Sequence, residues 1–241
     1  MPKHIVSFSG GKDSTAMLLR MLEEGWQVDE IIFCDTGMEF PDMYKHIEQV
    51  KDYIGQGITV VCPPKTFEYY MFEHVKVKGK RQGQKGYGWP DFRNRWCTAR
   101  LKQAPYFRHI KKYIDVVEYQ GIAIDERERE QSNAGRNIRY PLIEWGMTEK
   151  EALEYCYSKG FTWDGLYERF KRVSCWCCPL KSLPELKSLW KYYPELWEEL
   201  KEMDKRANNK FRLDYTFEQL EGRFQAEDNQ ATIFEGGSGE W

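Results

Sequence analysis

The stretch IVSFSGGKDSTAMLL, residues 5–19, joins a short apolar run to a helix-forming run through the glycine pair Gly10–Gly11. Glycine lets a backbone turn tightly and approach a ligand closely, and the N-terminus of a helix offers unpaired N–H groups to an anion. Lys12 adds a positive charge that can stabilise negative charge on a phosphate oxygen. The stretch therefore predicts a strand, a phosphate-binding loop and a helix, with Ser9, Ser14 and the loop amides around the phosphate.

A second interpretation is an ordinary strand-to-helix turn, in which Asp13 or Ser14 caps the helix. Such a turn does not require a lysine between its glycines and its cap, so Lys12 favours the phosphate-binding loop. The spacing also differs from the Gly-x-x-x-x-Gly-Lys-Ser/Thr pattern of a Walker loop. We therefore predict a phosphate-binding loop of another class.

Strand-like and helical runs alternate through the first half of the chain. The expected strands are residues 4–8, 30–34, 58–61 and 116–124, and the expected helices between them are residues 14–24 and 41–53. This alternation predicts an α/β fold with a doubly wound, mostly parallel sheet, on which ligands bind at the carboxyl ends of the strands. Both the glycine loop and the segment 34–37 follow directly after predicted strands.

The length of 241 residues and the absence of a Gly/Ser-rich or Pro-rich linker predict one principal domain. We expect it at residues 1–179, followed by a helical C-terminal extension at 180–224 and a flexible polar tail at 225–241. Within these parts, residues 148–159 are expected to form a helix capped by Thr148 and Glu151. Residues 183–208 are expected to form a second long helical region with a core-packing apolar stripe.

Residues 76–96 combine lysines and arginines with glycines and aromatic residues. This composition predicts a mobile basic loop within the principal domain, which closes over phosphates or receives a polynucleotide. An ordinary solvated loop is the alternative.

The overall charge limits the classes of partner. Lys and Arg total 36 and Asp and Glu total 38, which gives a net charge of -2, so any contact with nucleic acid must be local. No stretch approaches the roughly 18 apolar residues needed to span a bilayer, and we expect a cytoplasmic protein without membrane contact. Seven cysteines, an odd number, argue against an extracellular disulfide framework.

Four of the cysteines are candidate metal ligands. Cys175, Cys177 and Cys178 form a cluster with a Cys-x-x-Cys spacing followed by proline, and Cys97 lies far from them in the sequence. Thiolates at this spacing can bind one metal ion or one corner of an iron–sulfur cluster, and a distant thiolate can close the site. We favour an iron–sulfur cluster, with Cys177 as a fourth ligand or a free thiol. Zinc and no metal stay open, because four thiolates suit zinc equally well.

The remaining cysteines, Cys34, Cys62 and Cys156, are interpreted as buried small apolar residues. The histidines have no ligand partner at usable spacing and are assigned no role.

Five segments together resemble one protein family. The loop at residues 9–14 resembles the PP-loop of the ATP pyrophosphatase superfamily, whose members cleave ATP between the α and β phosphates and transfer AMP. Four further segments resemble blocks of the phosphoadenosine phosphosulfate (PAPS) reductase family within that superfamily. They are DTGMEFP at 35–41, RWCTARLKQAP at 95–105, GIAIDERER at 121–129 and RYPLIEW at 139–145. The resemblance covers roughly residues 5–212.

The resemblance implies an adenine nucleotide in the crevice of the sheet, with Asp35 and Thr36 near the adenosine and Lys102 and Arg129 near the phosphates. The implied nucleotide-binding residues are Ser7, Ser9, Gly10, Gly11, Lys12, Asp13, Ser14, Asp35, Thr36, Gly37, Lys102, Gly121, Asp125, Glu126 and Arg129. Lys12 and Asp13 are the implied catalytic residues, and Asp13 and Asp35 would hold Mg²⁺. Cys97 lies in the block where iron–sulfur relatives supply a cluster ligand.

Two departures from the PAPS reductases change the expected reaction. Those reductases bind a finished sulfonucleotide with a loop that lacks the Lys-Asp pair, whereas Lys12 and Asp13 are present here. They also end in a Glu-Cys-Gly-x-His tail that takes the sulfite, whereas no cysteine follows Cys178. The pattern is more similar to relatives that keep ATP cleavage, such as the sulfate adenylyltransferase small subunit and the enzymes of tRNA thiolation and DNA phosphorothioation.

The leading hypothesis is an ATP-dependent adenylyl and sulfur transferase. It binds ATP with Mg²⁺, adenylylates an oxygen of an acceptor, and allows sulfur to replace AMP. The alternatives are a sulfonucleotide reductase acting on PAPS or its non-phosphorylated analogue, and a nucleotide-binding sensor or subunit without turnover. The expected partners are an adenine nucleotide, a sulfur donor protein or thiol, and a nucleic acid as a candidate acceptor; a homo-oligomer stays open.

Overall fold

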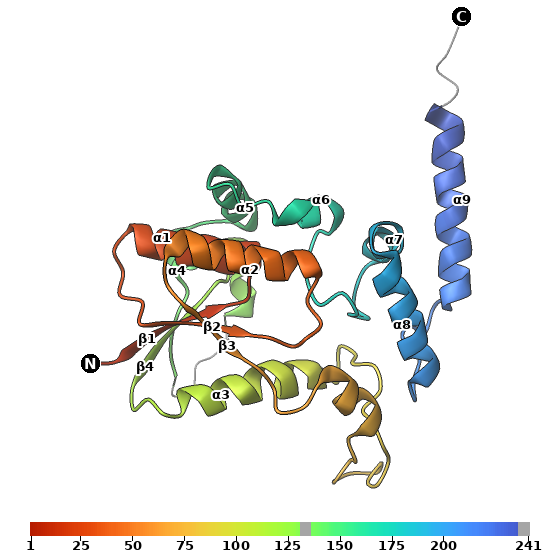
Figure 1. Ribbon diagram of the computed structural model, residues 1–241, viewed down its shortest axis with the longest axis horizontal. Helices are drawn as coiled ribbons and strands as arrows, with labels where there is room; N and C mark the ends of the chain where they lie inside the picture. Colours follow the sequence, from red (N-terminus) through yellow and green to blue (C-terminus); the bar gives the residue numbers. More distant parts are fainter. Residues whose placement is uncertain (131–135, 236–241) are drawn as a thin grey trace, which may run out of the picture. The chain divides into compact units, whose positions relative to one another are not determined.

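Among the residues that the structure describes, the sheet has five strands, all parallel, in the order β3-β2-β1-β4-β5 (Figure 1). The strands are β1 (Lys3–Phe8), β2 (Glu30–Cys34), β3 (Ile58–Val61), β4 (Val116–Gln120) and β5 (Asn137–Arg139). The structure is a computed structural model that describes residues 1–130 and 136–235, with side chains described to residue 229. The parallel α/β sheet predicted from the sequence is thereby confirmed.

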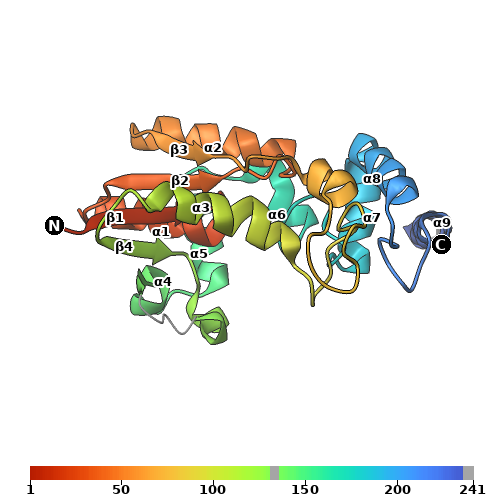
Figure 2. The same cartoon turned by 90° about the horizontal axis from the view of Figure 1, so that it is seen from below.

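Helices cover both faces of this sheet. Helices α1 (Lys12–Glu23) and α2 (Pro41–Ile54) lie on one face, and α3 (Ala104–Ile110) lies on the other (Figures 1 and 2). Further along the chain come α4 (Pro141–Glu144), α5 (Glu149–Ser158), which packs against α1, and α6 (Leu166–Arg169). The arrangement is therefore doubly wound, as the alternating pattern predicts.

The central strand β1 and its neighbour β2 form the core of the sheet because their apolar residues are covered on both faces. The residues that are at most 2% exposed are Ile5, Val6 and Phe8 of β1 and Ile31, Ile32 and Phe33 of β2. The predicted bounds of β2 and β3 are correct, but the strand expected at 116–124 ends at Gln120. The chain turns there, and residues Ile124–Arg129 form a short 3₁₀ helix instead.

The chain forms two compact units, and each combines two separate segments. The first consists of Met1–Phe67 and Arg95–Cys175 and contains the sheet; the second consists of Glu68–Asn94 and Trp176–Trp241. The sequence places the basic loop with the sheet, whereas residues 68–94 belong to the second unit. The reason is visible at Trp89, whose backbone N–H donates to Asn209 Oδ1 at 2.6 Å and whose carbonyl accepts from Asn209 Nδ2 at 3.1 Å.

The C-terminal helices of the second unit are α7 (Leu183–Tyr192), α8 (Pro194–Arg206) and α9 (Phe217–Glu235). The expected single region 183–208 is thus two helices. Pro194 has no N–H to donate into a continuing helix, so it begins α8 at its first position. Core packing of the apolar stripe is confirmed at its most buried positions, which are Leu186, Leu189, Trp197 and Leu200.

Helix α9 continues to Glu235, whereas the sequence predicts a flexible tail from residue 225. Two acidic residues of that stretch bind a lysine of α7, because Lys187 Nζ lies 3.2 Å from Glu227 Oε2 and 2.8 Å from Asp228 Oδ1. Phe224, one turn earlier, is 1% exposed and anchors the same face. Among the described residues, no helix is long and apolar enough to cross a membrane.

His46 of α2 is fully buried beneath the turn at Trp163. Its Nε2 lies 3.0 Å from Thr15 Oγ1, and its ring stacks on Trp163 at 4.2 Å between centroids. Burial disfavours the charged imidazolium and lowers the pKa of His46 to about 3. The folded protein therefore holds this ring neutral at every pH near neutrality.

We expect this ring to make stability pH-dependent. Unfolded His46 binds a proton below about pH 6.5 that the folded chain excludes, so the free energy of unfolding falls as the pH drops. Between pH 7.5 and 5 the loss from this residue is about 2 kcal/mol. His46→Phe keeps an aromatic ring but cannot titrate, so urea denaturation should show a pH dependence smaller by that amount. Equal pH dependence in the two proteins would contradict the neutral buried ring.

Candidate functional site

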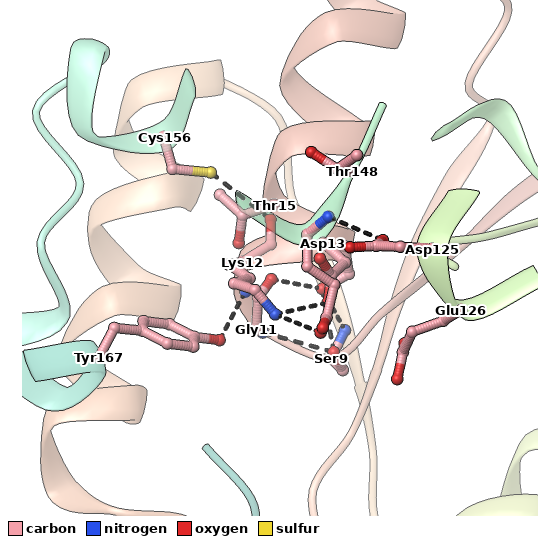
Figure 3. A network of polar contacts seen from close by, with 12 residues as sticks. Ser9, Gly11, Lys12, Asp13, Thr15, Asp125, Glu126, Thr148, Cys156 and Tyr167 are labelled. Carbon is pink, nitrogen blue, oxygen red and sulfur yellow. Dashed lines mark hydrogen bonds and ion pairs between the residues drawn. The ribbon is translucent and has the colours of Figure 1, made fainter. Parts of the chain in front are cut away.

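The glycine loop, residues 9–14, connects β1 to α1 at the carboxyl end of β1 (Figure 3). Gly10 has a φ of +77°, which residues with side chains rarely adopt, and a Cβ there would lie 2.6 Å from Met43 Sδ. Gly11 is extended and precedes the first residue of the helix, Lys12. Gly10 is therefore required by the close approach of the loop to α2.

Two serine hydroxyls cross the loop and hold its shape. Ser14 Oγ accepts the backbone N–H of Ser9 at 3.1 Å and donates to the carbonyl of Gly11 at 3.0 Å. The two hydroxyl oxygens, of Ser9 and Ser14, lie 3.0 Å apart. Both side chains are thus positioned at the N-terminus of α1, where the helix dipole favours an anion.

Lys12 lies in the loop with only 9% of its surface exposed. Its Nζ donates to Glu149 Oε1 at 2.6 Å and to Asp13 Oδ2 at 3.3 Å. Burial works to lower the pKa of Lys12, but the carboxylates of Asp13 and Glu149 outweigh it and hold the pKa above its ordinary value. The side chain is therefore a permanent cation at the helix N-terminus.

Three carboxylates gather beside this lysine. One oxygen from each of Asp13, Glu126 and Glu149 lies within 4.8 Å of the others. Asp13 Oδ1 is buried and has no hydrogen-bond partner among the described residues. Burial raises the pKa of Asp13 to about 6; Lys12 opposes this, and Glu149 and Glu126 add to it. Three carboxylates at this spacing fit a hard divalent cation such as Mg²⁺.

Three parts of the chain converge to build this group. Gly121 after β4 lies against the start of α1, since a Cβ there would be 2.8 Å from the backbone N of Ser14. Asp125, in the turn that follows, accepts the backbone N–H of Glu149 at 3.0 Å. Arg129 of the same turn forms an ion pair with Glu126. The three carboxylates therefore come from the start of α1, the turn after β4 and the start of α5.

Two cavities meet at Ser9. The loop cavity, with a volume of about 150 Å³, is lined by Ser9, Gly11, Lys12, Asp13, Ser14, Gly121, Glu126, Arg129, Glu149, Tyr167, Arg172 and Val173. The sheet cavity, with a volume of about 230 Å³, is lined by Ser7, Phe8, Ser9, Ile32, Phe33, Cys34, Lys102, Gln103, Tyr106, Phe107, Gln120 and Arg136. The first is lined mostly by polar and charged groups, and the second adds aromatic and aliphatic side chains from the strands and α3.

The segment after β2 has a different environment. Asp35 Oδ1 accepts the backbone N–H of Gly37 at 2.8 Å and the Tyr44 hydroxyl at 2.7 Å. Neither Asp35 nor Thr36 lines either of the two cavities. The carboxylates grouped with Asp13 are Glu126 and Glu149, and the expected pairing of Asp13 with Asp35 around Mg²⁺ stays a prediction.

Glu39, buried just beyond this segment, organises the neighbouring polar side chains. Its Oε1 accepts from Thr36 Oγ1 at 3.2 Å, from Lys102 Nζ at 3.3 Å and from the Cys175 thiol at 3.7 Å. Cys175 Sγ also lies 3.9 Å from Thr36 Oγ1. Lys102 therefore lines the sheet cavity from a partly buried position beside the Glu39 carboxylate.

The seven cysteines all lie in the described residues, and no disulfide bond joins any of them. Cys97 and Cys175 belong to the first unit, whereas Cys177 and Cys178 belong to the second, so the metal site expected on these four residues stays a prediction. Cys156 is buried, as expected, but Cys62 is exposed because it follows β3 at the edge of the sheet.

Sequence reasoning missed Glu149, Tyr167 and Arg172 in the loop cavity. The predicted capping box of Thr148 and Glu151 is present and places Glu149 at the first position of α5. That signal locates a helix N-terminus, but only the packing of α5 against α1 brings it to Lys12. Tyr167 and Arg172 carry no local signal of this kind.

We expect Gly121→Ala to destabilise the first unit. Its methyl group would overlap the backbone of Ser14, and overpacking of this kind costs about 1–3 kcal/mol of unfolding free energy in urea denaturation. Gly57→Ala is the matched control, because a Cβ at Gly57 meets nothing within 4 Å. Equal stabilities of the two variants would contradict the close contact.

Known proteins are similar to this chain in sequence or in fold. Two uncharacterised proteins of Methanocaldococcus jannaschii are similar, one 26% identical over 208 residues and the other 27% identical over 215 residues. The alignments cover 80% and 83% of this chain but 40% and 47% of those proteins, so the chain spans less than half the length of these relatives. The crystal structure of a PAPS reductase from Candida auris, in a phosphate complex, has a similar fold, with a TM-score of 0.53. It is 16% identical and covers 73% of this chain and 82% of that chain.

A family model covers most of the chain. The model described as the phosphoadenosine phosphosulfate reductase domain matches residues 3–181. This range contains the whole sheet, the glycine loop and every residue that lines the two cavities. The chain therefore belongs to the PAPS reductase domain family, within the PP-loop superfamily.

Proposed function

We propose that this chain is a PP-loop enzyme that binds ATP with Mg²⁺, splits it between the α and β phosphates, and adenylylates an acceptor for sulfur transfer. The observation that carries the proposal is the group of Asp13, Glu126 and Glu149 beside Lys12, at the N-terminus of α1. Carboxylates at this place suit a nucleotide that arrives with its own divalent cation.

The charges of the loop cavity favour such a metal–nucleotide complex over a bare polyanion. Lys12 is paired with Asp13 and Glu149, and Arg129 is paired with Glu126. A sulfonucleotide without a metal would compete with these carboxylates for the cations. When bound, Mg²⁺ would neutralise phosphate charge and use the three carboxylates, which leaves Lys12 and Arg129 to phosphate oxygens.

The two cavities divide the nucleotide between them. The sheet cavity offers aromatic and aliphatic walls to the adenosine, and the loop cavity offers Lys12, the serine hydroxyls and the loop amides to the departing pyrophosphate. Ser9 lines both cavities, so the α phosphate would lie beside it. Lys12 would stabilise the charge that builds on the leaving oxygen.

Two alternatives make different demands on the same site. A sulfonucleotide reductase would prefer PAPS and release sulfite with a thiol donor. A sensor or subunit without turnover would bind ATP and leave it intact. The predicted iron–sulfur cluster on Cys97, Cys175, Cys177 and Cys178 would serve the sulfur step of the proposed reaction.

We expect calorimetry to show Mg²⁺-dependent binding of ATP and much weaker binding of PAPS, because only ATP brings a metal that satisfies the carboxylates. With a suitable acceptor, Lys12→Ala should lose pyrophosphate release from ATP. Lys45→Ala is the control, because Lys45 is an exposed lysine that pairs with Asp42 and Asp164 on the surface.

Three results would contradict the proposal. Preference for PAPS would support the reductase, and ATP binding without pyrophosphate release in the presence of candidate acceptors would support the sensor. Pyrophosphate release that survives Lys12→Ala would remove the catalytic role of the lysine.

The acceptor that we propose is a nucleic acid, held by a basic hairpin at residues 75–85 of the second unit. Val75 and Lys85 form an antiparallel bridge, and the N–H of Gly83 donates to the carbonyl of Lys76 at 2.8 Å. The hairpin cations are Lys76, Lys78, Lys80, Arg81 and Lys85. Unlike most lysines of the described chain, these residues have no carboxylate partner within 4.0 Å among the described residues. Burial and the neighbouring Arg81 lower the pKa of Lys76.

The base of this hairpin is held in place by the turn after α8. Asn208 Nδ2 donates to the carbonyls of Lys85 at 3.1 Å and Gly86 at 3.2 Å. Trp89 is buried, and its indole N–H donates to Asp204 at 2.8 Å. Trp89 is therefore part of the core and is not available to stack on a base. Phosphate contact by the hairpin cations carries this part of the proposal.

We expect the triple variant Lys78→Ala, Lys80→Ala, Arg81→Ala to weaken binding of a fluorescent single-stranded oligonucleotide. Losing three phosphate contacts should reduce the slope of log affinity against log salt by about 2. The matched control removes the same charge from exposed lysines of the first unit, as Lys51→Ala, Lys111→Ala, Lys150→Ala. Similar losses in both variants would show that total charge, and not the hairpin, controls binding.

A further inference from the structure

Tyr167 of α6 reaches the glycine loop from a distant part of the chain. Its phenolic oxygen accepts the backbone N–H of Lys12 at 2.7 Å, although 155 residues separate the two (Figure 3). That N–H is one of the first amides of α1, the group that a bound phosphate would otherwise attract. A side chain outside the PP-loop therefore takes part in its hydrogen bonding.

The position of this phenol is fixed by an unusual turn. Trp163 and Asp164 both have a φ of 50°, which non-glycine residues adopt rarely. The turn carries Trp163 under the loop, where its indole N–H donates to the carbonyl of Gly10 at 2.8 Å. The Trp163 ring meets the Tyr167 ring edge-on at 4.9 Å between centroids. The phenol is thus held against the loop by packing, in addition to its hydrogen bond.

Gly11 leaves room for the phenolic oxygen. A Cβ at this position would lie 3.3 Å from Tyr167 Oη, closer than most side-chain contacts. The glycine pair therefore serves two approaches, Gly10 towards α2 and Gly11 towards Tyr167. These two close approaches are contacts within the chain and do not require a bound phosphate.

The hydroxyl proton of Tyr167 has no acceptor among the described residues, although Tyr167 lines the loop cavity. A phenol can donate one hydrogen bond while it accepts another. Burial raises the pKa of Tyr167; the Lys12 N–H opposes this, and the carboxylates of Asp13 and Glu149 add to it. The phenol therefore keeps its proton at any working pH.

We infer that Tyr167 is a phosphate-binding residue of this site, donating its hydroxyl proton to an oxygen of the pyrophosphate portion of the ligand while it accepts the Lys12 N–H. The inference rests on the proposed binding of a nucleotide by the PP-loop and adds a ligand group to it. The phenol lines the same cavity as Glu126 of the turn after β4, and the two side chains lie on opposite sides of the glycine loop (Figure 3). It would orient the oxygens that leave with pyrophosphate.

The test compares Tyr167→Phe with the wild-type chain by calorimetry, using inorganic pyrophosphate with Mg²⁺ as one probe and adenosine as the other. Phenylalanine keeps the ring packed on Trp163 and removes only the hydroxyl. We expect pyrophosphate affinity to fall about tenfold or more, because a hydrogen bond to a charged oxygen is lost, with adenosine affinity unchanged. Tyr155→Phe is the matched control, since that hydroxyl bonds Glu23 on the surface.

Each other outcome overturns the inference in a recognisable way. Unchanged pyrophosphate affinity would mean that the hydroxyl does not touch the ligand. Tighter binding would mean that the phenol competes with phosphate for the Lys12 amide. Equal losses for pyrophosphate and adenosine would indicate a purely structural role. A wild-type chain that binds neither pyrophosphate nor ATP would instead refute the proposed function.

Discussion

The ion pair between the largely buried Lys12 and the half-buried Glu149 is the interaction on which the site depends. Burying a lysine until 9% of its surface is exposed destabilises the fold unless a carboxylate compensates its charge. Glu149 supplies that carboxylate at 2.6 Å. Glu149 stands at the start of α5, whose position is fixed by Asp125 through a backbone N–H. Contacts around Lys12 thus connect three elements, which are α1, the turn after β4 and the start of α5. Removing Glu149 would leave the largely buried Lys12 with Asp13, at 3.3 Å, as its carboxylate partner.

The same convergence explains why a single edge of the sheet carries two cavities of different character. The carboxyl ends of β1 and β2 supply apolar walls, while the start of α1 supplies amides, hydroxyls and charge. Ser9 lies where these surfaces meet, because it is the first residue after β1. A molecule with an aromatic ring at one end and phosphates at the other matches this arrangement in its chemistry. The hydrogen bonds between Ser9 and Ser14 hold the loop in this position.

Local sequence patterns predict the elements whose structure depends on residues nearby in the chain. The strand 30–34, the glycine loop and the Thr148–Glu151 cap depend on neighbours within a few residues, and each was located correctly. Tyr167 could not be predicted as a site residue, because its place there depends on contact with Lys12, 155 positions away. The helix beyond residue 225 was missed for a related reason, since its polar composition resembles a tail until Lys187 pairs with it. Among the three grouped carboxylates, the motif identifies Asp13, whereas Glu149 is brought there by the packing of α5 on α1.

The discontinuous second unit has a consequence for the order of events during synthesis. Residues 68–94 leave the ribosome well before Asn209, which lies 120 positions after Trp89, the residue it holds. At ordinary elongation rates this gap lasts roughly 6 to 24 s, far longer than a hairpin needs to form. The first unit is complete at Cys175, so it can fold while the basic segment still waits for its partners. Through that interval the hairpin lacks the contacts of Asn208 and Asn209, which can hold it only after the whole first unit has been synthesised.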